Sequence, residues 1–329
     1  MLGASVNSVA RLAACAALLV ATSTADRASA FCRMTTEGGA QIAGAPCEEK
    51  GAPLVWTNAC LSYAIDGNAS NYMDYAEVEQ AVDASFATWQ TADCGGGQTP
   101  NLVFQPLQPS NCKRAEYNCE GNVNTIAFLD PWRDECAPEN QGYDQWAFAV
   151  TIVWHNTSSG EIYDADMMIN DEMATQFNAG GPYDNCPDTG CPEGGTGRPG
   201  PADLASIVTH EAGHFIGIGH SEVEEATMFA SAERSSVAKR TLETDDINAV
   251  CTIYPPGNLD ATCDATPRGG LQLDCPANEC ADAACSNAGS KSGCSAAGSP
   301  ADAPWASVLA ALLGLTVLQR RSRRRAARS

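Results

Sequence analysis

Three of the chain's four histidines fall in residues 210–220, which read HEAGHFIGIGH. Residues four apart share one face of a helix, so His210 and His214 would aim their imidazoles at a common point. Gly217 can end that helix in a sharp turn, because glycine tolerates positive φ, and the turned chain would bring up His220. Three histidines around an open fourth position form a catalytic zinc site, which predicts one Zn²⁺ held by His210, His214 and His220.

Glu211 directly follows the first histidine and lies at the edge of the same helical face. From there its carboxylate can reach a metal-bound water and take a proton from it, as the hydrolysis of a peptide bond requires. These residues therefore predict zinc-dependent hydrolysis with Glu211 as general base. Two alternatives are unliganded histidines on an ordinary helix and a closed structural zinc site. The second conflicts with the presence of Glu211 and with the absence of a fourth ligand.

The extended pattern H-E-x-x-H-x-x-G-x-x-H resembles the metzincin peptidases and, among them, the matrixins. Ser221 directly after the third histidine and Met228 eight residues past it are matrixin-like. Phe229 stands where matrixins usually have tyrosine, and Ala230 replaces the usual proline. The resemblance implies a zinc-dependent endopeptidase acting on proteins or peptides, in which Met228 forms a hydrophobic floor below the metal. A metzincin of another subfamily is an alternative that Ser221 and the Met228 spacing argue against.

The resemblance is strong over residues 202–255 and weaker over 60–170, where only the order of helix and strands agrees. It implies an α+β fold with a twisted mixed sheet, an active-site helix, a turn carrying the methionine and a C-terminal helix. It also implies that Asp245 and Asp246 support the site through hydrogen bonds. The alternative for this pair is exposed carboxylates at a helix N-terminus. Residues 230–241 would form a wall of the specificity pocket.

Two usual matrixin features are missing from the sequence. Matrixins carry a propeptide cysteine, in P-R-C-G, that caps the zinc, and Cys47 in Ala-Pro-Cys-Glu is a poor match. We expect Cys47 to be half of a disulfide, with a latency role as the alternative. Matrixins also use extra histidines for a structural zinc, and only His155 remains outside the cluster, so we expect no second zinc. The main rival from another class is a non-catalytic surface or adhesion protein that keeps the zinc fold, and the intact Glu211 argues against it.

Calcium ligands are a further hypothesis. Asp164 and Asp166 share one face of a predicted strand and could offer carboxylate oxygens to Ca²⁺. The alternative is that both carboxylates are solvated or bonded to the backbone. Asp184, Asp188 and Glu193, in a long Gly/Pro-rich loop, are similar candidates.

Hydrophobic periodicity predicts the elements that must position these residues. Apolar side chains at spacings of three and four predict a helix over residues 75–90. Further helices are expected from about residue 202 through the histidines, with Asp203 in the first turn, and over 242–254. Strands are expected over residues 60–65, 102–104, 125–129, 147–154 and 161–170, the last two forming a hairpin.

The composition restricts the class of function. The formal net charge of −21 opposes binding to nucleic acid or to anionic membranes. It suits a soluble extracellular protein, and we expect a monomer. The chain's 16 cysteines are scattered, which favours disulfides and an oxidising compartment. Ten lie in residues 32–251 and four in 263–285, so each region could pair internally, with Cys186 and Cys191 stapling the long loop.

The two ends of the chain are predicted to direct export. Residues 1–30 have the features of a secretory signal peptide, with a lipoprotein signal as the alternative. Residues 31–258 would form the catalytic domain and 259–300 a Cys/Ala/Gly-rich linker. Residues 301–329 combine a short hydrophobic helix with an Arg-rich tail and resemble the C-terminal sorting tags of myxobacterial surface proteins. That resemblance implies processing near Cys294, whereas a plain transmembrane anchor is the alternative. Either would place the domain outside the cytoplasm.

Overall fold

The computed structural model describes residues 31–37, 47, 49–117, 121–133, 142–176, 183–190, 201–233, 236–257, 263–275 and 291–298. The predicted signal peptide (1–30) and the hydrophobic and Arg-rich tail (301–329) lie outside these ranges. Within them, no helix has the length and apolar character needed to span a bilayer.

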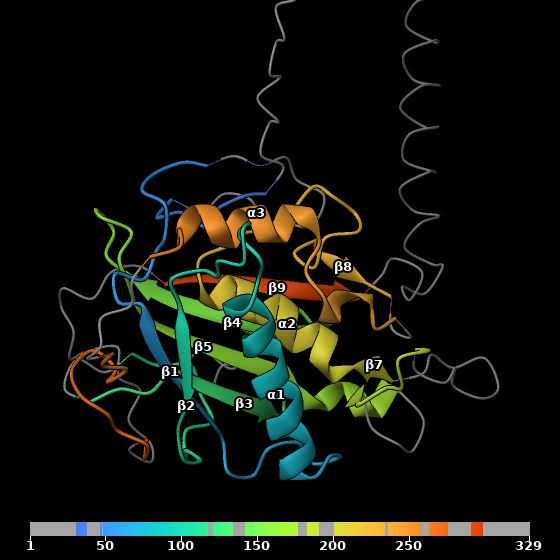
Figure 1. The fold of residues 1–329 in the computed structure, drawn as a ribbon. Coiled ribbons are helices and arrows are strands. Elements are labelled where there is room, and N and C mark those ends of the chain that lie inside the picture. The colour runs from blue at the N-terminus through green and yellow to red at the C-terminus, as the bar shows by residue number, and fades with distance from the viewer. Residues whose placement is uncertain are drawn as a thin grey trace, which may run out of the picture.

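A mixed sheet forms the centre of the molecule (Figure 1). Among the described residues its strand order is β2-β1-β3-β5-β4-β9-β8. The strands are β1 Cys60–Ile65, β2 Val103–Pro106, β3 Thr125–Leu129, β4 Ala147–His155, β5 Ile162–Asn170, β8 Ser231–Ala232 and β9 Lys291–Gly298. Strands β2, β1, β3 and β5 run parallel, whereas β4 is antiparallel to both β5 and β9. β6 Tyr183–Asp184 and β7 Ala202–Asp203 form a separate small parallel pair.

Helices α1 Tyr75–Gln90 and α2 Leu204–Phe215 cover one face of this sheet, and α3 Thr244–Ile253 lies along one end (Figure 1). Two 3₁₀ turns, η1 Asp171–Gln176 and η3 Ala238–Arg240, complete the described helical segments. α1 starts at a capping box in which Asp74 and Glu77 satisfy each other's backbone N–H groups. The predicted α+β architecture is therefore confirmed.

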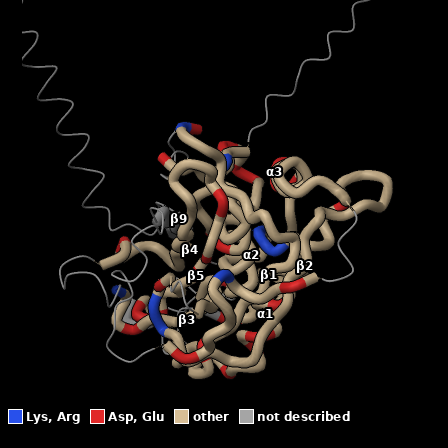
Figure 2. The backbone as a smooth tube through the Cα atoms, turned by 90° about the vertical axis from the view of Figure 1, so that its left-hand side faces the viewer, with Lys and Arg blue, Asp and Glu red and all other residues tan. Residues whose placement is uncertain are grey.

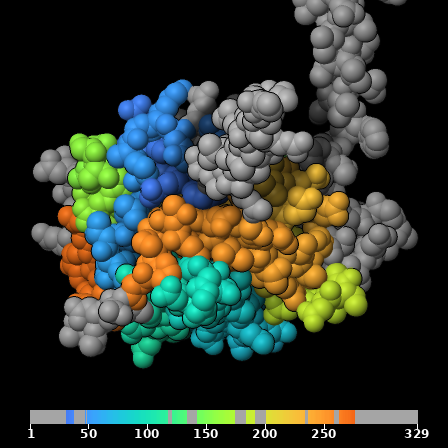
Figure 3. Space-filling model, turned by 45° about the horizontal axis from the view of Figure 1, so that its top comes forward, coloured from blue at the N-terminus to red at the C-terminus, as the bar shows by residue number. Residues whose placement is uncertain are grey.

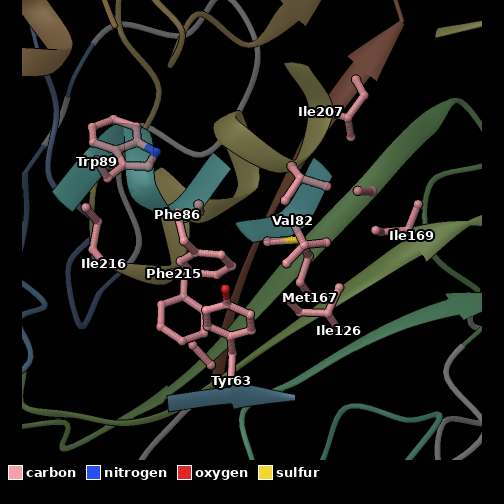
Figure 4. Packing of buried hydrophobic residues seen from close by; sticks show 14 of the residues in the cluster. Tyr63, Val82, Phe86, Trp89, Ile126, Met167, Ile169, Ile207, Phe215 and Ile216 are labelled. Carbon is pink, nitrogen blue, oxygen red and sulfur yellow. The ribbon is translucent and has the colours of Figure 1, made fainter. Parts of the chain in front are cut away.

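The core joins α1 and α2 to the sheet through aromatic side chains (Figure 4). Phe86 of α1 stacks on Tyr63 of β1 with ring centroids 4.2 Å apart, and meets Phe215 of α2 edge-on at 5.2 Å. Burying one such ring stabilises the fold by about 1.5–3 kcal/mol. The indole N–H of Trp89 donates to the carbonyl of Thr209 at 2.8 Å. The helix that carries the histidines is thus fixed by α1.

Disulfides connect the predicted domain to the predicted linker. The described pairs are Cys32–Cys47, Cys60–Cys263, Cys94–Cys251 and Cys112–Cys275. The expectation that residues 32–251 and 263–285 pair separately is wrong, because two pairs cross between these regions. Residues 263–275 lie against the domain, where the Ser62 hydroxyl also donates to the carbonyl of Ala265 at 2.6 Å. Sequence composition did not indicate this docking.

Two predictions about single cysteines concern the described residues. Cys47 is half of a disulfide, as predicted, so its sulfur is not available to cap a metal. Cys186 is also disulfide-bonded. Its predicted partner, Cys191, lies outside the described residues.

Candidate metal centre

The start of the histidine helix is held by a buried carboxylate. Asp203 is the N-cap of α2, and its carboxylate accepts hydrogen bonds from the backbone N–H and the hydroxyl of Ser206, each at 2.8 Å. Arg240 pairs with the same carboxylate through Nε at 2.8 Å and Nη2 at 2.5 Å. This bidentate pair connects α2 to the segment that follows the third histidine.

A turn built on Gly217 carries the chain from α2 to the third histidine. Gly217 has a φ of +83°. Its N–H donates to the carbonyl of His214, and the next N–H, that of Ile218, donates to the carbonyl of Gly213, both at 2.9 Å. A Cβ on Gly217 would lie 2.7 Å from the carbonyl oxygen of Leu54. The left-handed backbone and this close approach both require glycine.

Groups from distant segments hold the turn in place. The donors and acceptors are Met34 N–H to Gly217 O (2.9 Å), Gly219 N–H to Cys32 O (2.8 Å), Trp56 Nε1–H to Phe215 O (2.8 Å) and Tyr254 hydroxyl to Ile216 O (2.9 Å). Figure 3 shows the N-terminal segment, in blue, beside α3, in orange. Trp56 and Tyr254 were not identified from the sequence, because each contact joins residues far apart in the chain.

The turn brings the three histidines together. One ring nitrogen of each lies within 4.8 Å of the others. His214 Nε2 and His220 Nε2 are 3.3 Å apart, close to the ~3.3 Å expected between two nitrogens on one tetrahedral zinc. Nδ1 of His210 and Nδ1 of His214 each lie 2.7 Å from a carbonyl oxygen, that of Thr227 and that of Ile218. Such bonds place the proton on Nδ1 and leave Nε2 to bind the metal.

The environment of the histidines favours their metal-binding form. Burial lowers the pKa of His210 and that of His214 well below the usual histidine value, and a neighbouring histidine lowers each further. Both imidazoles are therefore neutral near pH 7. Nε2 of His210 is buried without a hydrogen-bond partner among the described residues. An unpartnered buried nitrogen facing two more ring nitrogens fits a zinc ion.

Glu211 is positioned by the sheet. Its side chain is fully buried, and the Thr151 hydroxyl donates to Glu211 Oε2 at 2.6 Å. Thr151 lies in β4, so the strand beside α2 fixes the rotation of the carboxylate next to the histidines. The sequence predicted this strand, but nothing in it distinguished Thr151 from its neighbours.

Met228 lies directly below α2. Its side chain is 1% exposed. A Cβ added to Gly213 would collide with Met228 Sδ and with the ring of Trp89. The backbone of α2 thus packs directly on Met228 at the turn that carries the histidines. Only glycine at position 213 permits this close contact.

The aspartate pair of α3, Asp245 and Asp246, supports the turn that carries Thr227 and Met228, here called the methionine turn. Asp246 accepts hydrogen bonds from the backbone N–H groups of Thr227, at 2.7 Å, and Met228, at 3.0 Å. Asp245 accepts from the Ser221 hydroxyl at 2.5 Å. Because the carbonyl of Thr227 is the partner of His210 Nδ1, Asp246 is only one residue removed from the histidine triad.

A family model decides the classification. The model for matrixins matches residues 55–255, which include β1 to β5, α2 and α3. The chain belongs to the matrixin family. It carries a matrixin-type zinc endopeptidase domain with an intact triad of His210, His214 and His220.

Curated relatives match a short part of this matrixin. Metalloendoproteinase 1-MMP of Arabidopsis thaliana is 44% identical over 54 residues, which are 16% of this chain and 15% of that protein. Metalloendoproteinase 5-MMP of the same plant is 42% identical over 52 residues, 16% of this chain and 14% of that protein. The chain thus spans about a seventh of the length of these relatives.

A cavity of about 250 Å³ lies beside the first half of α2 in the matrixin domain. Its lining includes Phe148 and Ile207, and it continues along the segment from Phe229 to Lys239. Lys239 Nζ donates to the carbonyls of Thr227, at 3.1 Å, and Phe229. Burial lowers the pKa of Lys239 to about 8. The segment expected to form a wall of the specificity pocket does line a cavity.

The proposed calcium ligands are buried in this matrixin rather than open to solvent. Asp166 accepts hydrogen bonds from the backbone N–H groups of Glu116, at 2.9 Å, and Thr125, at 2.7 Å. Asp164 accepts one from Asn122 Nδ2 at 2.5 Å. Burial raises the pKa of both carboxyl groups well above the usual aspartate value. The geometry favours hydrogen-bonded structural carboxyls, the alternative considered above, and calcium binding stays a prediction.

The other calcium candidates gain no support. Asp188 pairs with Arg240 Nη1 at 3.3 Å, Asp184 lies in β6, and Glu193 is outside the described residues. A further described cluster, of Cys112, Glu116 and Cys275, contains two cysteines that are bonded to each other. It therefore offers no thiolates to a metal.

We expect Asp164→Asn to become more stable relative to the wild type as the pH rises. A folded-state pKa above the unfolded value means that the folded chain binds a proton that the unfolded chain has released. The wild type therefore loses about 1.4 kcal/mol of stability per pH unit between the unfolded pKa, about 4, and the raised folded pKa. Asparagine cannot ionise, so the free energy of unfolding of the variant, measured by urea unfolding at several pH values, should fall less steeply with pH than that of the wild type. Asp93→Asn on the surface is the control. A millimolar Ca²⁺ stabilisation lost in Asp164→Asn would instead establish the calcium site.

Proposed function

We propose that this matrixin is a zinc-dependent endopeptidase that hydrolyses peptide bonds with Glu211 as general base. The observation that carries the proposal is the Glu211 carboxylate, buried beside the histidine triad and held by Thr151. Burying a carboxylate costs free energy. A protein that only binds its partner has no need of a buried carboxylate at this position. The curated relatives are named metalloendoproteinases, which supports the same class of reaction.

The residues present divide the reaction between metal and carboxylate. When bound, zinc lowers the pKa of a coordinated water to about 7 and polarises the substrate carbonyl. Glu211 accepts the proton of the attacking water and then delivers it to the leaving amine. Thr151 keeps the carboxylate oriented through both transfers. The Nδ1 hydrogen bonds of His210 and His214 keep the ligands in one tautomer throughout.

Metal removal tests this function. The full disulfide-bonded chain should cleave casein, gelatin or members of a peptide library over long incubations. A chelator should abolish cleavage, and one equivalent of zinc should restore it. One equivalent of zinc bound with no cleavage, by the natural chain or by the variant with weakened β9 pairing described below, would favour the non-catalytic surface protein.

We further propose that the domain works outside the cytoplasm, as a secreted or surface-displayed enzyme. Support comes from the four described disulfides and from acidic residues that outnumber basic ones along the backbone in Figure 2. On this proposal residues 1–30 are removed and 301–329 anchor or sort the chain. Mass spectrometry of the protein from fractionated cells tests both, and reduced, full-length chain in the cytosol would contradict them.

A further inference from the structure

Strand β9 lies in the sheet between β4 and β8, alongside α2 (Figure 1). It pairs antiparallel with β4 from Trp154↔Lys291 to Ala147↔Ala297. On its other side it pairs parallel with β8, where Ser231 is opposite Ala297. β9 therefore fills the space between two strands that contribute directly to the site.

The register places β9 beside the strand residue that orients Glu211. Cys294 of β9 is paired with Thr151 of β4, the residue whose hydroxyl holds Glu211. β9 also contacts α2. At its far end it pairs with β8, in the segment that lines the cavity beside α2. The strand thus runs from the β4 residue that holds Glu211 to the β8 segment that lines the cavity.

Without β9, the groove would have two unpaired strand edges. Such edges bind an extended peptide through backbone hydrogen bonds, largely independent of its sequence. An endopeptidase must hold its substrate extended next to the metal and the general base. The backbone positions available for that peptide are the ones that residues 291–298 occupy.

We propose that residues 291–298 are an internal competitor that occupies the substrate groove and must leave before a protein substrate can bind. The proposal rests on the endopeptidase function proposed above. Strand and groove belong to one chain, so the competition is intramolecular and independent of enzyme concentration. The small and polar sequence of the strand, Lys-Ser-Gly-Cys-Ser-Ala-Ala-Gly, has low β-propensity, which keeps the strand exchangeable.

A double proline substitution in the full chain tests the proposal. Neighbouring residues of a strand point their N–H groups to opposite sides, so Ser295→Pro with Ala296→Pro removes one N–H from the β4 side whichever residue supplies it. The matched control, Ser295→Ala with Ala296→Ser, changes the side chains and keeps both N–H groups. Both variants should bind one zinc, which verifies folding of the site.

Kinetics on a peptide substrate then decide. If β9 blocks the groove in most molecules, apparent KM scales inversely with the open fraction and kcat does not change. We expect KM of the proline variant to fall at least about tenfold at all enzyme concentrations, and KM of the control variant to equal that of the wild type.

Equal KM in all three proteins would overturn the occlusion and leave the endopeptidase function intact. Loss of cleavage in the proline variant with zinc retained would make β9 a required part of the site, which also overturns the proposal. No cleavage by any of the three would mean that the proposed function itself fails.

Discussion

Replacing Glu211 with glutamine should lower kcat/KM for peptide cleavage by about 10²–10⁴-fold while one zinc stays bound per chain. Glutamine has the size of glutamate, and its amide oxygen can accept the Thr151 hydrogen bond now made by Glu211 Oε2. It cannot accept a proton from water near pH 7. The metal ligands are three other residues, so zinc content by atomic absorption should equal that of the wild type.

Two controls separate the proton transfer from its surroundings. Glu79→Gln makes the same chemical change on the exposed face of α1 and should have wild-type activity. Thr151→Val keeps the carboxylate but removes the hydroxyl that orients it, so its loss should be smaller than that of Glu211→Gln. Full activity in Glu211→Gln with zinc bound would show that another group takes the proton.

Sequence reasoning was most accurate where the determining interactions are local. The helix Tyr75–Gln90 and the strands Cys60–Ile65 and Thr125–Leu129 have the predicted bounds. Their apolar periodicity and turn residues are contained within each segment. The histidine triad was predictable for the same reason, since one helix and one glycine turn deliver all three ligands.

The parts of the site that were missed depend on contacts between distant segments. Thr151 reaches Glu211 across 60 positions in the sequence, and Trp56 reaches the end of α2 across 159. Neither residue stands in a motif. Spacing within one segment carries no information about such contacts, because they exist only after the sheet has packed on α2.

β9 shows the same limit for secondary structure. Residues 291–298 have neither alternating hydrophobicity nor β-branched side chains, and composition predicted a linker. The segment becomes a strand because its backbone pairs with the edges of β4 and β8. Strand formation at an existing edge is governed by context more than by intrinsic propensity. The cross-region disulfides of Cys60 and Cys112 were unpredictable for a related reason, since connectivity follows from the folded distances.

Asp246→Ala should destabilise the methionine turn and weaken zinc binding together. The Asp246 carboxylate is 1% exposed and accepts the N–H groups of Thr227 (2.7 Å), Met228 (3.0 Å) and Glu243 (2.9 Å). Alanine would leave buried N–H groups without an acceptor, which costs about 1–3 kcal/mol for each one fully buried. We expect the free energy of unfolding of the zinc-free protein to fall by about 2–5 kcal/mol.

The zinc effect follows from the same contacts. Thr227 presents its carbonyl to Nδ1 of His210, so a displaced turn loosens the outer support of one ligand. Loss of such support typically lowers metal affinity 10–100-fold. Competition with a chromophoric chelator measures the affinity, and urea unfolding with and without zinc separates the two effects. Asp184→Ala, an exposed aspartate of β6, is the control and should change neither. If the Asp246→Ala protein were destabilised but kept its zinc affinity, Asp246 would contribute to folding alone. That result would show that His210 keeps its position without an ordered turn beside it.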